Sequence, residues 1–301
     1  MSTLRPQYLY SRSYTKIIIP PVSTVILTTA SIQSLLRFIV SESNNMDRAI
    51  KALRKNVEWR NRVRPQEAQC PACSREKNNH AMRIVGLTKE FKSVVYNCWA
   101  TCKDRYDADE TVHHMRRVLE DSAKITKKTF QNSPARQIRE AMERGKMTFI
   151  FDFQGFGLRD ASPQALTKFV NDCLQNYAER LEQMLFIDAP GLFKPCWNLL
   201  KAGLPQETVD KFQFCSSKDL RKNYSAILGE ELTCWLEQEM QENRDKNAVK
   251  RKFYWEPVWP DGKPKYHLSL GCHSYVNSEY FVPLSGNQQC KGSYNFERYR
   301  R

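Results

Sequence analysis

The sequence predicts an α/β fold with parallel strands, and three neighbouring elements lead to this prediction. Residues 147–153 are almost all apolar and rich in aromatic and β-branched side chains, which is typical of a strand buried on both faces. Ser162-Pro163 marks a helix start, and apolar residues then recur at helical spacing. A second apolar strand, residues 184–188, stops at Ala189-Pro190-Gly191. A strand, a helix and a strand in this order form a right-handed βαβ unit.

The remaining elements divide the chain into four parts. Residues 1–30 hold Arg5, Arg12 and Lys16 but no acid, so they read as a disordered leader or as an organelle-targeting segment. Residues 31–83 form a helical module that ends at Pro65, followed by a polar connector. A lobe spans residues 84–236, with a strand at 92–97 and helices at 109–125 and 134–144. Residues 237–301 comprise a charged helix and an aromatic-rich extension.

Composition favours a globular protein that meets an anionic partner. The chain has 301 residues, 41% of them hydrophobic, and a formal net charge of +14. The excess of basic residues indicates either an anionic partner, which is nucleic acid or a membrane surface, or simply a basic face that is solvated. Because no aromatic-interleaved RNA-binding motif is present, we expect no nucleic-acid partner and favour lipid headgroups.

The ten cysteines are scattered, without the close, even spacing of a secreted scaffold. We therefore expect reduced thiols and a cytoplasmic protein that is peripheral at membranes, with an organelle as the alternative if the basic leader directs targeting. The apolar run from Ile17 to Ala30 is short and is interrupted by Pro20-Pro21, so no membrane span is expected. The oligomeric state is left open.

Five segments carry a family resemblance. They read SLLRFIVSESNNMDRAIKALRKNVEWR, FIFDFQGFG, NYAERLEQMLFIDAP, LPQETVDKFQF and CSSKDLRKNYSAILGEEL. In this order the series resembles the CRAL-TRIO lipid-binding family, in particular the group of the yeast phosphatidylinositol transfer protein. The resemblance implies a mixed, largely parallel β-sheet floor with helices on one side, a gate helix over the mouth and a small helical module in front. It also implies a lipid as ligand.

The expected gate helix runs from Gly191 to Gly203. Phe193, Trp197, Leu200 and Leu204 recur there at helical spacing, and further apolar residues widen the face. A helix with so wide an apolar surface is usually buried, so the residues alone favour a core helix. The resemblance instead implies a helix that swings outward at a membrane.

The resemblance also implies a headgroup site. It places Glu179, Arg180, Thr208 and Lys211 at positions that hold the inositol phosphate, and it places Met147, Phe149 and Phe151 in the lipid pocket. A carboxylate accepts hydrogen bonds from hydroxyls and an ammonium neutralises a phosphate, although an ordinary surface ion pair is the simpler interpretation.

Two departures weaken the match with the inositide-binding members. Glu42 and Ser43 stand where those members carry a basic pair. Met147 and Phe149 replace the hydroxyl side chains that hold phosphatidylcholine. The sequence thus retains part of an inositide site and loses the contacts used for choline lipids.

We expect no metal, no catalytic residue and no cofactor other than the bound lipid. Cys70-Pro71-Ala72-Cys73, with His80 after it, has the spacing of half a zinc site, but a structural zinc site needs four ligands. Cys98 and Cys102, or His113 and His114, complete the set only if the fold brings them near.

The sequence predicts a non-enzymatic carrier or sensor of a single lipid, with a phosphoinositide as the candidate. The alternative is a membrane-associated scaffold that does not exchange lipid.

Overall fold

The structure is a computed structural model of the chain. It describes residues 8–10, 16–18, 32–75, 79–90, 92–103, 105–131, 145–160, 167–168 and 175–251. The helix expected at 134–144 lies outside the described residues, and so does most of the helix expected after Ser162. The aromatic-rich extension from residue 253 also lies outside them.

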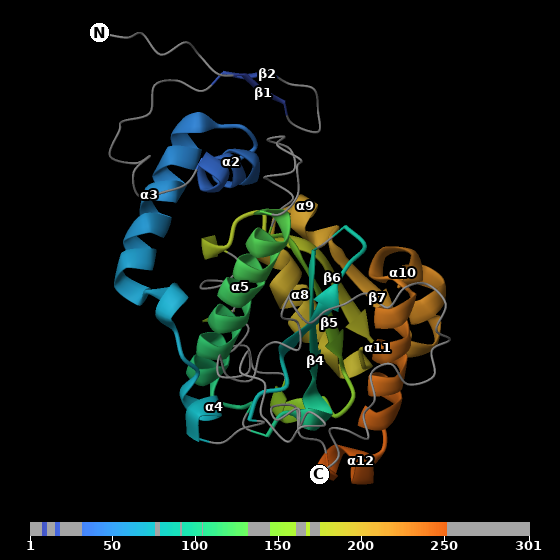
Figure 1. The fold of residues 1–301 in the computed structure, drawn as a ribbon. Coiled ribbons are helices and arrows are strands. Elements are labelled where there is room, and N and C mark those ends of the chain that lie inside the picture. Colours follow the sequence, from blue (N-terminus) through green and yellow to red (C-terminus); the bar gives the residue numbers. More distant parts are fainter. Residues whose placement is uncertain are drawn as a thin grey trace, which may run out of the picture.

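A five-stranded mixed sheet forms the centre of the molecule, in the order β3-β4-β5-β6-β7 (Figure 1). The strands are β3 (Arg83–Leu87), β4 (Ser93–Cys98), β5 (Met147–Asp152), β6 (Leu181–Ile187) and β7 (Phe212–Cys215). β3 is antiparallel to β4, and the other neighbours are parallel. Ile150 of β5 lies between Tyr96 and Leu185 in register. The α/β class, the largely parallel sheet and the parallel pairing of the two predicted strands are confirmed.

Alternating side chains on each strand build two cores, one on each face of the sheet. Phe149 and Phe151 of β5 pack in the first core, with α5 (Ala108–Gln131) and α8 (Lys194–Ala202). Ile150 packs in the second core, with α10 (Leu220–Leu228) and α11 (Glu230–Asn243). Figure 1 shows α5 and α11 on opposite sides of the sheet. Helices therefore cover both faces, which corrects the expectation of helices on one side only.

The helical module consists of α2 (Ile32–Ser41) and α3 (Met46–Val63), which pack on each other through a third core. The side chain of Asn45 caps α3 by accepting a hydrogen bond from the Arg48 amide. The helix ends at Val63 and Pro65 follows two residues later, as predicted. The connector then contains η1 (Pro65–Glu67) and α4 (Pro71–Arg75).

The charged helix that follows the lobe is part of the fold. α11 runs through the expected boundary at residues 236 and 237, and Glu239 and Asn243 beyond it are buried. The smaller elements are β1 (Tyr8–Tyr10) paired antiparallel with β2 (Lys16–Ile18), η2 (Trp99–Thr101), η3 (Leu158–Asp160), η5 (Gly191–Phe193), α9 (Gln206–Val209), η6 (Ser217–Asp219) and α12 (Lys246–Arg251). Among the described helices, none has the length and apolar character needed to cross a bilayer.

Candidate functional site

A cavity of about 400 Å³ lies between the helical module and the lobe. Glu42 and Lys55 line it from the module side, following α2 and within α3. Glu179, Thr208 and Lys211 line it from the lobe side. Apolar atoms of Phe38, Leu181 and Leu204 form part of the same wall. Three of the four predicted headgroup residues therefore meet in one concave space.

Glu179 and Lys211 form an ion pair in this cavity. The Lys211 Nζ lies 3.3 Å from Glu179 Oε2, and the side chains are 24% and 19% exposed. Glu179 has a positive φ of 52°, which a non-glycine residue adopts at a conformational cost, two residues before β6 begins at Leu181. The carbonyl of Thr208 accepts a hydrogen bond from the Lys211 amide at 3.1 Å. A side-chain ion pair and a backbone hydrogen bond thus link Lys211 to Glu179 and Thr208.

Arg180 and Ser43 do not line the cavity. The guanidinium of Arg180 donates to the carbonyl of Gly145 at 3.3 Å. Burial lowers the pKa of Arg180. Sequence reasoning missed Lys55, whose only signal is its position three residues after Ala52, another residue of the cavity wall.

The predicted lipid-pocket residues lie inside the first core. Met147, Phe149 and Phe151 are all buried there. Aromatic rings crowd this face: Phe186 packs against the rings of Phe151 and Phe212 at 6.2 and 5.6 Å between centroids. The face that would hold lipid tails is therefore occupied by the protein's own side chains.

The predicted gate helix, η5 and α8, lies against this aromatic face. Phe193 and Leu200 are buried, and Trp197 and Leu204 pack at the edge of the same core. The Trp197 ring lies 5.1 Å from that of Phe212. Leu199 points the other way and is 50% exposed. One face of the helix thus covers the sheet while an apolar side chain remains on the outer surface.

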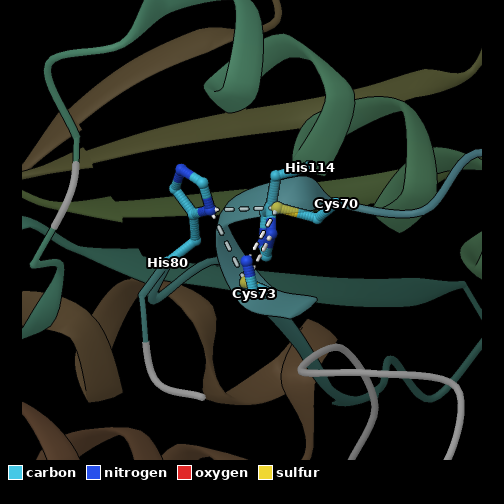
Figure 2. Close-up of side chains that lie close together, drawn as sticks. All are labelled: Cys70, Cys73, His80 and His114. Atoms are coloured by element: carbon cyan, nitrogen blue, oxygen red, sulfur yellow. Dashed lines mark hydrogen bonds between the residues drawn. The ribbon is translucent and has the colours of Figure 1, made fainter. Parts of the chain in front are cut away.

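A second cluster lies beside α4 and α5, where Cys70, Cys73, His80 and His114 point toward one another (Figure 2). Three pairs carry sulfur-to-nitrogen contacts: Cys70 Sγ to His80 Nδ1 at 3.3 Å, Cys73 Sγ to His80 Nδ1 at 3.6 Å, and Cys73 Sγ to His114 Nδ1 at 3.5 Å. Contact with the Cys73 side chain, followed by burial, raises the pKa of the Cys70 thiol. The fold adds His114, not Cys98, Cys102 or His113, to the three residues that the sequence had grouped.

Comparison with known proteins identifies the class to which this fold belongs. Residues 88–232 match the family described as CRAL/TRIO domain. The matched residues make up a little under half of the chain and run from the turn after β3 into α11, and the match confirms the resemblance stated from the sequence.

Two curated relatives are distant in sequence. "Phosphatidylinositol transfer protein SFH5" of Cryptococcus neoformans is 24% identical over 70% of this chain and 72% of its own length. "CRAL-TRIO domain-containing protein C3H8.02" of Schizosaccharomyces pombe is 25% identical over 62% of this chain and 42% of its own length. Among solved structures, "Crystal structure of Sfh5" aligns with a TM-score of 0.49 and 14% identity, over 64% of this chain and 66% of that one. The chain thus spans less than half of the second curated relative and about two thirds of the solved chain.

Proposed function

We propose that the protein binds one lipid with an inositol phosphate headgroup and carries it between membranes or senses it. The observation that supports this proposal is the meeting of Glu179, Thr208 and Lys211 in a single cavity. A carboxylate and a hydroxyl suit a ring bearing several hydroxyl groups, and an ammonium suits the phosphate. Lys55 supplies a second cation at the same wall. The relative named as a phosphatidylinositol transfer protein supports the same ligand class.

Two acids limit the affinity of this cavity for a phosphate. Glu42 and Glu207 also line it, so the cations Lys55 and Lys211 face three carboxylates in all. A bare phosphate is repelled by this excess of carboxylates over ammonium groups. A headgroup with hydroxyl groups is repelled less, because its hydroxyls can donate hydrogen bonds to the carboxylates. The ligand favoured by the charges is therefore a polyhydroxylated headgroup with one phosphate close to Lys211.

The cavity accommodates a headgroup but not the acyl chains. Its volume of about 400 Å³ lies near the lower end of the roughly 300–1,000 Å³ range of small-molecule sites. The tails would lie on the aromatic face next to it, beneath α8. Loading then requires α8 to move away from Phe186 and Phe212. We infer a non-enzymatic cytoplasmic protein that docks transiently on anionic membranes, consistent with the net charge of +14.

Competitive loading from mixed vesicles tests the headgroup assignment. Wild-type protein is incubated with vesicles containing phosphatidylinositol and phosphatidylcholine, and the bound lipid is quantified by mass spectrometry. Lys211→Ala should lower inositol-lipid uptake by the roughly 1.5–3 kcal/mol of a charge-assisted hydrogen bond, about ten- to a hundredfold. Lys222→Ala, an exposed lysine on α10 away from the cavity, is the matched control and should leave uptake unchanged.

Glu42→Arg should act in the opposite direction and raise inositol-lipid uptake, because it replaces a repelling carboxylate with a cation. Glu58→Arg on the exposed side of α3 makes the same charge change outside the cavity wall and serves as its control. The inositol-headgroup assignment would be contradicted if the wild type took up both lipids equally and neither Lys211→Ala nor Glu42→Arg changed that uptake. That result would indicate an apolar ligand held by shape.

The alternative function is a membrane-associated scaffold whose lobe does not exchange lipid. The tight aromatic packing between α8 and the sheet is the observation that favours it. Mass spectrometry of an organic extract of the purified chain separates the two functions. A stoichiometric lipid supports the carrier, whereas an empty and stably folded lobe supports the scaffold.

A further inference from the structure

We propose that Cys70, Cys73, His80 and His114 form a structural zinc site that fastens the helical module to the lobe. Each residue offers one ligand atom, and the four atoms all lie within 4.8 Å of one another. Two thiolates and two imidazoles form the donor set that selects zinc in a tetrahedral site. Because four protein ligands fill the tetrahedron, no position is left for a water or a substrate, and the site is structural rather than catalytic.

The ligand spacing fits a zinc ion. Bond lengths of about 2.3 Å to sulfur and 2.0–2.1 Å to nitrogen, at tetrahedral angles, separate adjacent sulfur and nitrogen ligands by about 3.5 Å. The three sulfur-to-nitrogen contacts measure 3.3, 3.6 and 3.5 Å. A hydrogen-bonded cluster of thiols and imidazoles has similar pair distances, so the argument also needs the orientation of each ligand.

The histidines are oriented as ligands. His114 is 1% exposed, and its Nε2 lies 2.8 Å from the carbonyl of Met82, which assigns the proton to Nε2 and leaves the Nδ1 lone pair facing the sulfurs. A carbonyl on the second ring nitrogen is the usual support of a zinc-bound histidine. His80 is 3% exposed, and the polar contacts of its ring are those that Nδ1 makes with Cys70 and Cys73. Its Nε2 is buried without a hydrogen-bond partner in the part of the chain that the structure describes.

The cysteines show a local geometry that suits thiolate ligands. Neither Cys70 nor Cys73 is in a disulfide. The Cys73 amide donates to Cys70 Sγ at 3.4 Å, across the first turn of α4. A thiol is a weak hydrogen-bond donor and acceptor, so thiols alone compensate poorly for burying two imidazoles. A zinc ion replaces these weak contacts with four coordinate bonds.

The four ligands come from segments that are separate in the chain. Cys70 and Cys73 belong to the connector at α4, His80 precedes β3, and His114 lies on α5 of the lobe. Other contacts also join the module and the connector to α5: Arg117 donates to the Ala68 carbonyl at 3.0 Å, Arg60 of α3 pairs with Glu120 at 2.7 Å, and Trp59 of α3 packs in the first core. A zinc ion would therefore hold the connector, which continues α3, against α5.

The test is metal analysis of the full chain, expressed with a tag other than polyhistidine that is then removed. Inductively coupled plasma mass spectrometry should find about one zinc ion per chain. Cys73→Ser and His114→Ala should each reduce zinc several-fold. His113→Ala, the neighbouring residue on α5 that is not part of the cluster, and Cys196→Ser, a thiol on α8, should retain the full content.

A second measurement does not depend on how the variants fold. Wild-type protein stripped of metal under reducing conditions is titrated with Co²⁺. One equivalent should produce the thiolate charge-transfer band and the visible bands of tetrahedral cobalt, and added zinc should abolish them. The proposal would be overturned if the wild-type protein as purified contains no zinc and the metal-free protein also fails to give these bands with Co²⁺. So would a Cys70–Cys73 disulfide in the protein as purified, or zinc loss in His113→Ala equal to that in His114→Ala.

Discussion

At the scale of single residues, a buried ion pair attaches α11 to the sheet. Arg83 of β3 and Glu239 of α11 lie 2.8 Å apart with side chains that are 1% and 0% exposed. The guanidinium carbon of Arg83 lies 5.6 Å from the ring centroids of both Tyr96 and Trp235. Glu239 appears in the sequence as one of several acids on a charged helix. Only the fold reveals that it faces inward, because its partner is 156 residues away.

Removing one partner of this pair should be costly. Glu239→Ala leaves the Arg83 charge buried and is expected to lower the free energy of unfolding by about 3–5 kcal/mol. Glu237→Ala is the matched control, since its pair with Arg221 is partly exposed and should contribute at most about 1 kcal/mol. Urea unfolding of both variants measures the difference. Equal, small effects would show that Arg83 finds a replacement partner or water.

At the scale of elements, local patterns were sufficient for most of the lobe. β5 and β6 follow from apolar runs bounded by turn residues, and the end of α3 follows from Pro65. β3 was not predicted as a strand. Arg83 and Gly86 interrupt its apolar run, and an added Cβ on Gly86 would lie 3.0 Å from Leu232 of α11. Glycine at position 86 thus allows α11 to approach β3 closely. This is a tertiary contact, so the local sequence pattern does not predict it.

The outer face of α8 supplies a prediction about membrane docking. Leu199→Asp should weaken binding to anionic vesicles several-fold and leave the thermal midpoint unchanged, because this side chain is 50% exposed and packs little in the fold. Asn198→Asp adds the same charge at the neighbouring exposed position without removing apolar surface, so it separates hydrophobic insertion from charge repulsion. Vesicle co-sedimentation measures both variants. Identical losses in the two would attribute the effect to charge and remove α8 as the inserting element.

At the scale of the whole molecule, both candidate sites lie where the helical module or its connector meets the lobe. The cavity lies where Glu42 and Lys55 face Glu179 and Lys211. The cysteine and histidine cluster (Figure 2) lies in the connector that follows the module, at α4. If α8 moves during loading and the connector binds zinc, as proposed above, the connector would hold the module in position and the headgroup wall would remain assembled.

The two sites differ in how far the sequence predicts them. Glu179, Thr208 and Lys211 were identified through a family resemblance, because neither periodicity nor spacing distinguishes them from surface residues. Cys70, Cys73 and His80 stand close in the chain and have ligand spacing, yet three residues leave a zinc site incomplete. His114 and Lys55 complete the two sites from distant helices. The sequence names His114 only as one of several candidates and does not indicate Lys55, so the tertiary fold is needed to select both residues.

The cysteines allow a prediction that bears on both the compartment and the metal. Cys70, Cys73, Cys98, Cys102, Cys196 and Cys215 are outside disulfides, whereas Cys234 is disulfide-bonded and departs from the expectation of reduced thiols. Counting thiols in denatured, unreduced protein with a chelator should therefore find at least these six of the ten. A lower count would contradict a reducing compartment.

The same reagent applied to native protein without a chelator reports on the connector. Cys70 and Cys73 should resist alkylation, since a zinc-bound thiolate reacts more slowly than the same thiolate without metal. Adding a chelator should expose both together, because losing the ion releases the two sulfurs at once. Cys196 on α8, partly buried and remote from the cluster, should alkylate at the same rate in both conditions. If Cys70 and Cys73 react at chelator-independent rates, burial rather than metal governs their protection.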